Sequence, residues 1–186
     1  MADPEAAHAR ATDAQPRGAT LPESVTPAAE RCTVPTLIHE FDYHVDVGGV
    51  ADVGTGPYGH RMIAAGSGGK VVGDRLTGTI APSAGGDWLL LGQDGYGRLD
   101  VRNTVLTADG ACVYIQLHGL VELTPAVLAV FAGGAVPTDF GGQYFVTTPR
   151  LETGDERYAW VNRVLFVAEA RILPGPCIDY RVFRVG

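Results

Sequence analysis

Cysteine is scarce in this chain of 186 residues, which contains only Cys32, Cys112 and Cys177. An odd and widely spaced set does not make a disulfide framework, so we predict three free thiols and a reducing, cytoplasmic location. Long apolar runs are also lacking. None approaches the roughly 18 residues of a membrane span, and the N-terminal segment has no apolar core of the secretory-signal kind. We therefore expect no membrane partner.

Basic residues are few as well. The chain has 14 Lys and Arg against 21 Asp and Glu, which gives a formal net charge of -7. The cations are dispersed and form no stripe along a phosphate backbone, so nucleic acid is not an expected partner. Glycine, by contrast, is abundant, with 25 residues that mostly separate short alternating runs. This distribution is typical of a β-rich fold with many turns.

The N-terminal segment differs in composition from the rest of the chain. Residues 1–34 are rich in Ala, Pro and small polar side chains, and such a segment cannot offset its ordering entropy by burial. We predict a disordered arm there, followed by a single β-barrel domain over residues 35–186. A domain of that length can bury a core without metals or disulfides.

Alternation with a period of two predicts the strands. The stretch LIHEFDYHVDV, residues 37–47, alternates strictly and is a strong strand signal. Further strands are predicted near 61–65 and 75–81, with a glycine-rich bend between them. More follow along the chain, including YAWVNRVLFVAEARIL at 158–173, where Tyr158, Trp160 and Asn162 would share one face.

One short helix is expected over residues 125–132. Thr124 occupies the N-cap position, Pro125 the first helical position and Gly133 the position after the last turn. The predicted fold class is therefore all-β, an antiparallel β-barrel with one short helix that covers one end.

The stretch DVRNTVLTADGACVYIQLHG, residues 100–119, predicts a β-hairpin. Its polar side chains share a face only if Thr104 pairs with Tyr114, which requires a three-residue turn at 108–110 with Gly110 left-handed. Two interpretations of that face stay open: a solvent-exposed outer face over an apolar core, or the lining of a pocket inside the barrel. Large aromatic residues on other strands favour the pocket. The face carries Asp100, Arg102, Thr104, Tyr114, Gln116 and His118.

Familiar phosphate and metal motifs are not met. AGSGGKVV, residues 65–72, fails as a Walker loop and as a dinucleotide fingerprint, because the required glycines are missing and no βαβ unit surrounds it. His39 and His44 face opposite sides of their strand, and no clustered Cys/His ligand set appears in the sequence. We expect neither a metal nor a cofactor.

Three segments in this order resemble the DUF3237 family: LTGTIAPSAGGDW, GRLDVRNTVLTADGACVYIQLHG and YFVTTPRLETGDERYAWVNRVLFV. The resemblance covers roughly residues 35–186. It implies an antiparallel β-barrel that is often oligomeric, so we expect a homodimer or a larger homo-oligomer. The matching positions are Asp87, Trp88, Asp100, Arg102, Asp109, Gly110, Tyr144, Arg150, Tyr158, Trp160 and Asn162.

Three functions compete for such a barrel. The first is a cofactor-independent dehydratase or cyclase of secondary metabolism that acts on a small aromatic, polyketide-like intermediate, since this chemistry needs only positioning and one acid/base pair. The second is a lipocalin-like binding protein without turnover, and the third is a structural module. The first is favoured because the acid and base groups exceed the needs of a passive carrier.

Each group has an expected role in the favoured interpretation. Asp100 or His118 would remove a proton alpha to a carbonyl, Tyr114 or Tyr158 would protonate the departing hydroxyl, and Arg102 would hold the enolate. The residues expected to bind substrate are Trp88, Gln116, Tyr144, Arg150, Trp160 and Asn162.

Overall fold

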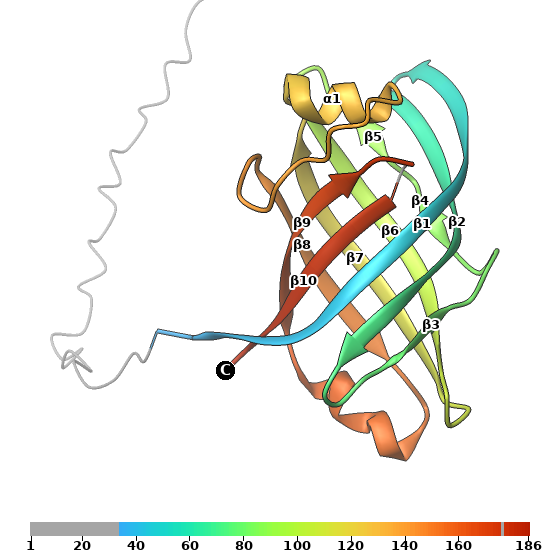
Figure 1. The fold of residues 1–186 in the computed structure, drawn as a ribbon, viewed down its shortest axis with the longest axis vertical. Coiled ribbons are helices and arrows are strands. Elements are labelled where there is room, and N and C mark those ends of the chain that lie inside the picture. Colours follow the sequence, from blue (N-terminus) through green and yellow to red (C-terminus); the bar gives the residue numbers. More distant parts are fainter. Residues whose placement is uncertain (1–33, 176) are drawn as a thin grey trace, which may run out of the picture. The chain divides into compact units, whose positions relative to one another are not determined.

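A computed structural model describes residues 34–175 and 177–186, which form a closed antiparallel β-barrel (Figure 1). Apart from Val34, the predicted N-terminal arm lies outside the described residues. The strands are β1 (Leu37–Gly56), β2 (Gly59–Gly73), β3 (Gly78–Ile80), β4 (Gly86–Asp87), β5 (Leu90–Leu91), β6 (Tyr96–Thr107), β7 (Cys112–Glu122), β8 (Phe145–Glu152), β9 (Phe166–Leu173) and β10 (Cys177–Val185). The helices are α1 (Pro125–Phe131) and the 3-10 helix η1 (Glu156–Arg163). The predicted antiparallel barrel is confirmed.

The barrel closes because β1 pairs with both β10 and β2. The short strands β3, β4 and β5 pair with successive parts of β2 on one side and of β6 on the other. Together these three short strands occupy one strand position of the barrel. With the seven long strands, the barrel therefore has eight strand positions. The interior of a barrel of this size is filled by side chains or holds one small ligand.

Local sequence accounts well for the strands that carry alternating patterns. In β1 the side chains of Phe41, Tyr43 and Val45 are buried, as the alternation of residues 37–47 predicts. The hairpin of β6 and β7 has the predicted register, with Thr104 opposite Tyr114 and Asp100 opposite His118.

The turn of this hairpin also matches the prediction. Gly110 has a φ of 88°, and the Thr107 amide donates to the Ala111 carbonyl at 3.0 Å.

The glycine-rich stretch does not separate two strands. The predicted strand near 61–65 continues through Gly66–Gly69 as the single strand β2, and its register against β1 shifts near Val47. Gly69 has a φ of 134°, and a Cβ there would lie 2.1 Å from the His44 carbonyl oxygen. Only glycine fits this close approach. The adjacent register shift leaves Ser67 unpaired as a β-bulge, so the stretch is not a bend between two strands.

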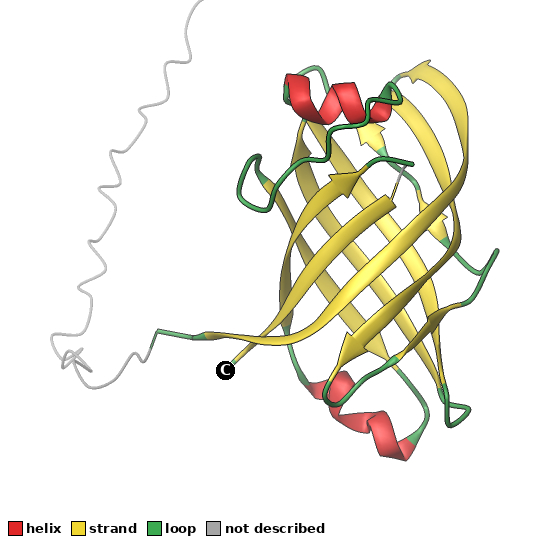
Figure 2. Cartoon of the chain, in the orientation of Figure 1, coloured by secondary structure: helices red, strands yellow, loops and turns green. Residues whose placement is uncertain are grey.

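The two helices lie at opposite ends of the barrel in Figure 2. The predicted helix is confirmed as α1, where the Thr124 side chain accepts from the Val127 amide at 3.2 Å. The strand predicted over residues 158–173 is wrong in its first part, which is η1. There Asn162 donates to the Thr153 carbonyl and accepts from the Thr153 amide, each at 2.9 Å. These side chain–backbone bonds hold the segment in a tight turn despite its apparent alternation.

No helix within the described residues has both the length and the apolar character that crossing a membrane requires. Cys112 and Cys177 are free thiols, as predicted. The third cysteine, Cys32, lies outside the described residues.

Candidate functional site

An interior cavity of about 320 Å³ lies at the α1 end of the barrel. Its wall consists mainly of aliphatic side chains from β1, β2, β6 and β7, and α1 contributes Leu128 and Phe131. The polar residues in this wall are Asp87, Asn103 and Tyr180. Mostly apolar cavities with a few convergent polar groups are typical of small-molecule sites.

Asp87 is the acidic residue of the cavity wall. It ends β4 and sits between Ala64 of β2 and Val101 of β6. Its Oδ1 accepts a hydrogen bond from the Asp100 amide at 3.0 Å. Burial raises the pKa of Asp87 to about 6, although that hydrogen bond and the charge of Arg61 act in the opposite direction. A carboxyl group that titrates near neutral pH can both accept and release a proton, as a general acid/base must.

Two polar residues, Asn103 and Tyr180, line the cavity near this carboxyl group, and the buried Tyr43 contacts both of them. The Asn103 amide donates to the Tyr43 hydroxyl, and the Tyr43 ring stacks on Tyr180 with centroids 5.2 Å apart. Burial raises the pKa of both tyrosines, and the nearby charge of Asp87 adds to the effect at Tyr180. Both phenols therefore stay protonated, and each keeps an O–H that can donate a hydrogen bond.

Asn103 also has an unused acceptor. The residue is 1% exposed, and among the described residues its Oδ1 has no hydrogen-bond partner. This oxygen packs against Gly66 and Gly85, where a Cβ would lie 3.0 Å and 2.5 Å away respectively. Bare backbone at these glycines leaves room for a polar side chain within an apolar wall.

The polar face of the β6–β7 hairpin points outward, so the prediction that it lines the barrel is wrong. Along β6 every second residue is buried, and three members of this buried row line the cavity: Leu99, Val101 and Asn103. Side chains alternate across a strand, which places the predicted polar set on the outer surface. That set is Asp100, Arg102, Thr104, Tyr114, Gln116 and His118.

Some of these predicted site residues do meet on the outer surface. Arg102 forms an ion pair with Asp100 at 3.0 Å, and His118 Nδ1 lies 3.6 Å from the same carboxylate. The Arg102 guanidinium lies over the Trp88 ring, 5.0 Å from its centroid. Gln116 is opposite both Arg102 and Arg150 in the sheet. The cluster is a half-exposed ion-pair network and not an enclosed pocket.

The other predicted site residues are dispersed. The Tyr158 hydroxyl donates to Asp109 at 3.1 Å, and Trp160 packs beneath the Arg75 guanidinium at 3.8 Å. Tyr144 is 51% exposed. These contacts, like those of Asn162 described above, stabilise η1 and the loops at the barrel ends. The structure does not bring these residues into the interior cavity.

Sequence reasoning named Asp87 only as a position that matches the family and assigned none of the cavity's polar groups to the site, although one signal was present for Asn103. Asn103 is the polar member of an otherwise apolar strand face with Leu99, Val101 and Val105. A buried amide in such a row indicates either a structural hydrogen bond or a lining position. Asp87 precedes Trp88 in a short segment without strand periodicity, and its inward direction depends on its pairing with β2 and β6.

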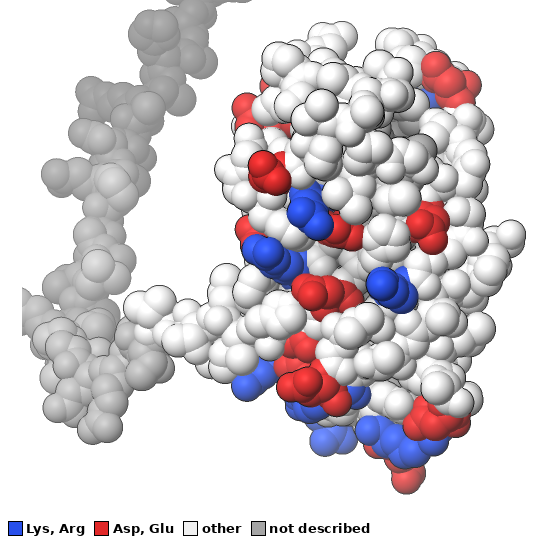
Figure 3. All heavy atoms as spheres, viewed as in Figure 1, with Lys and Arg blue, Asp and Glu red and all other residues white. Residues whose placement is uncertain are grey.

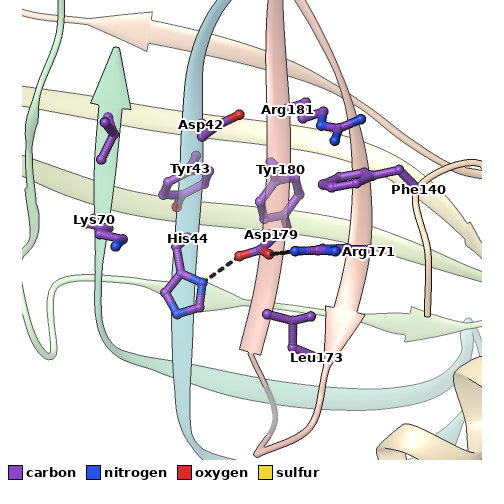
Figure 4. A pocket seen from close by; sticks show the side chains of 11 residues that line it. Asp42, Tyr43, His44, Lys70, Phe140, Arg171, Leu173, Asp179, Tyr180 and Arg181 are labelled. Atoms are coloured by element: carbon purple, nitrogen blue, oxygen red, sulfur yellow. Dashed lines mark hydrogen bonds and ion pairs between the residues drawn. The ribbon is translucent and has the colours of Figure 1, made fainter. Parts of the chain in front are cut away.

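A second hollow lies on the outer face of β1, β9 and β10 (Figure 4). It is an open groove of about 420 Å³. Arg171 and Arg181 flank the Phe140 ring at 4.9 Å and 4.1 Å from its centroid. In Figure 3 most of the visible charged residues lie over the middle and the η1 end of the barrel, and fewer lie at the flanks of the α1 end.

The model of a family described as "Protein of unknown function (DUF3237)" matches residues 35–185. A UPF0311 protein of Bradyrhizobium diazoefficiens is 33% identical over 138 residues, covering 73% of this chain and 89% of that protein. A solved structure of a conserved protein of unknown function from Rhodopseudomonas palustris has a TM-score of 0.72 and 27% identity, over 82% of this chain and 97% of that one.

A further solved structure, described as an enzyme from Penicillium herquei, has a TM-score of 0.61 and 18% identity. The alignment covers 84% of this chain and 98% of that one. At this identity the likeness shows a shared fold.

Proposed function

The chain belongs to the DUF3237 family, and from its cavity we propose that it is a cofactor-independent enzyme. In this proposal an apolar, oxygenated small molecule of the aromatic polyketide kind enters the cavity and undergoes dehydration or ring closure. The observation that carries the proposal is the carboxyl group of Asp87, held in an apolar cavity beside the protonated phenol of Tyr180.

The cavity groups suffice for a balanced dehydration of a β-hydroxy ketone. The ionised Asp87 carboxylate takes the proton from the carbon alpha to the carbonyl, and the substrate becomes an enolate. Tyr180 donates a hydrogen bond to the enolate oxygen, where a preorganised donor is most effective. As the carbon–carbon double bond forms, the carbon–oxygen bond to the β-hydroxyl breaks. The Asp87 carboxylic acid returns its proton to that oxygen, and water leaves.

Apolar walls support the same chemistry. The aliphatic lining of the cavity excludes water, which strengthens electrostatic interactions at the reacting atoms. The cavity volume of about 320 Å³ is near the lower end of the roughly 300–1,000 Å³ range of small-molecule sites. A substrate of one or two fused rings is therefore the best fit.

A lipocalin-like binding protein without turnover is the second candidate, and one experiment separates the two. The protein is incubated with a panel of aryl β-hydroxy ketones, and water loss is followed by mass spectrometry while binding is measured by calorimetry. We expect turnover by the wild type and a decrease of about 10²–10⁴-fold in Asp87→Asn. Asp42→Asn, which changes an exposed carboxylate on the outer face, is the matched control and should keep the wild-type rate.

The other outcomes are equally informative. Binding without conversion by any protein variant would establish the binding function and refute the enzyme. If no compound binds, both uses of the cavity are refuted. Equal turnover rates in wild type and Asp87→Asn would refute the role of Asp87.

A further inference from the structure

His44, Asp46 and Cys177 form a cluster on the outer face of the barrel. In the pairing of β1 with β10, His44 is opposite Asp179 and Asp46 is opposite Cys177. Directly opposed residues point to the same face of a sheet. One potential ligand atom from each of the three residues lies within 4.8 Å of the other two. Imidazole, thiolate and carboxylate are the ligand types that bind zinc in proteins.

The spacing of the cluster is close to that of a tetrahedral site. His44 Nε2 lies 3.1 Å from Asp46 Oδ1, and Cys177 Sγ lies 3.5 Å from the same oxygen. Tetrahedral zinc, with bonds of about 2.0–2.2 Å to nitrogen and oxygen and about 2.3 Å to sulfur, separates its ligand atoms by about 3.3–3.7 Å. Small side-chain rotations are therefore enough to enclose an ion.

A second layer of contacts orients the imidazole. His44 Nδ1 lies 2.6 Å from Asp179 Oδ1, and Arg171 donates to the other Asp179 oxygen at 2.8 Å and 3.0 Å (Figure 4). Histidines that bind metals usually donate their second N–H to a carboxylate in this way, which fixes the tautomer and turns the other nitrogen to the metal. Here that other nitrogen faces Asp46.

A cysteine nucleophile is a poorer account of the same residues. Cys177 donates to Asp46 at 3.5 Å, so a carboxylate and not the imidazole is the thiol's partner. Burial, and after it the contact with Asp46, raises the pKa of the Cys177 thiol. Nucleophilic cysteines instead lie in electropositive surroundings that lower the pKa of the thiol.

We propose that His44, Asp46 and Cys177 bind one zinc ion, with Asp179 as the residue that orients His44. Three protein ligands leave the fourth tetrahedral position to water or to an external donor. The expectation of no metal, drawn from the sequence, is thereby replaced by a specific ligand set. The proposal is independent of the proposed function, because Asp179 and His44 line the outer groove and neither residue lines the interior cavity.

The test uses the untagged full chain, reduced and freed of metal with a chelator. Cobalt is added to detect the thiolate-to-cobalt charge-transfer absorption, and zinc affinity is then measured by competition with a chromophoric chelator. We expect one zinc ion per chain. Cys177→Ser should abolish the charge-transfer band, and His44→Gln should weaken zinc binding at least tenfold. Asp179→Asn should weaken it about 10–100-fold with the band retained. Cys32→Ser and Cys112→Ser are the matched thiol controls and should bind like the wild type.

Circular dichroism and thermal unfolding verify that each variant is folded, and Asp46→Asn replaces any ligand variant that is not. Failure of the wild type to bind zinc stoichiometrically would overturn the proposal. So would full binding in both Cys177→Ser and His44→Gln, or loss of the cobalt band in Cys112→Ser.

Discussion

The Asp87 carboxyl group predicts a specific dependence of stability on pH. Its pKa is about 6 in the folded protein, against an ordinary value of 3.8 for an aspartate carboxyl. Between these two values the folded state binds more protons than the unfolded state, so the free energy of unfolding must fall as pH rises. The shift of about two pKa units corresponds to about 3 kcal/mol at most, since one unit is about 1.4 kcal/mol. This stability is present below pH about 4 and is lost once pH exceeds about 6.

Substitution of Asp87 by asparagine isolates this effect. The Asn oxygen can still accept from the Asp100 amide, but the side chain no longer titrates. The free energy of unfolding of Asp87→Asn should therefore rise relative to the wild type by up to about 3 kcal/mol between pH 4 and pH 7. Contributions from all other titrating groups are common to both proteins and cancel in the difference.

Urea unfolding at a series of pH values measures the difference, with Asp94→Asn as control. Asp94 is exposed, and its hydrogen bond from Arg98 lowers the pKa of the carboxyl to about 2. Its contribution has the opposite sign, because it is present above the unfolded pKa and lost as pH falls. The Asp94→Asn difference should accordingly decrease as pH rises from about 2 to about 4 and stay constant from pH 4 to pH 7. A wild-type minus Asp87→Asn difference that stays constant from pH 4 to pH 7 would refute the placement of this carboxyl in an apolar cavity.

Three further predictions concern the outer network, the close approach at Gly69 and the cap of α1. Arg102→Met should change the free energy of unfolding by no more than about 1 kcal/mol, because the ion pair of Arg102 is half-exposed. Turnover in the cavity should stay unchanged, because Arg102 lies on the outer face. Loss of turnover would indicate that the outer face is a catalytic site. Gly69→Ala should destabilise the fold by at least about 1–3 kcal/mol in urea unfolding, because of its positive φ and the close His44 carbonyl. Gly49→Ala, with no atom within 4 Å of the new Cβ, should not, and equal effects would contradict the close approach of β2 to β1 at Gly69. Thr124→Ala should cost about 1 kcal/mol through loss of the cap on α1, and an unchanged urea midpoint would show that the cap is dispensable.

Features that depend on neighbours in the sequence could be predicted from the sequence alone. Alternation identified β1, and turn chemistry at Gly110 together with the polar pattern determined the register of β6 against β7. Thr124 and Pro125 located α1. Each of these depends on interactions within a few residues, or on the two strands of one hairpin, so a linear pattern contains the necessary information. The η1 segment was mistaken for strand because its alternation was outweighed by the bonds of Asn162 to the Thr153 backbone.

Which side chains line the interior of the barrel was decided only by the tertiary structure. A strand with two dissimilar faces specifies which side chains lie together, but the closure of the sheet between β1, β2 and β10 decides which face becomes the inside. The buried row that contains Asn103 therefore faces the cavity, and the charged row that contains Asp100 faces water. The zinc ligand set depends on the same closure. Asp46 and Cys177 are 131 residues apart, and only the pairing of the first long strand with the last brings them together.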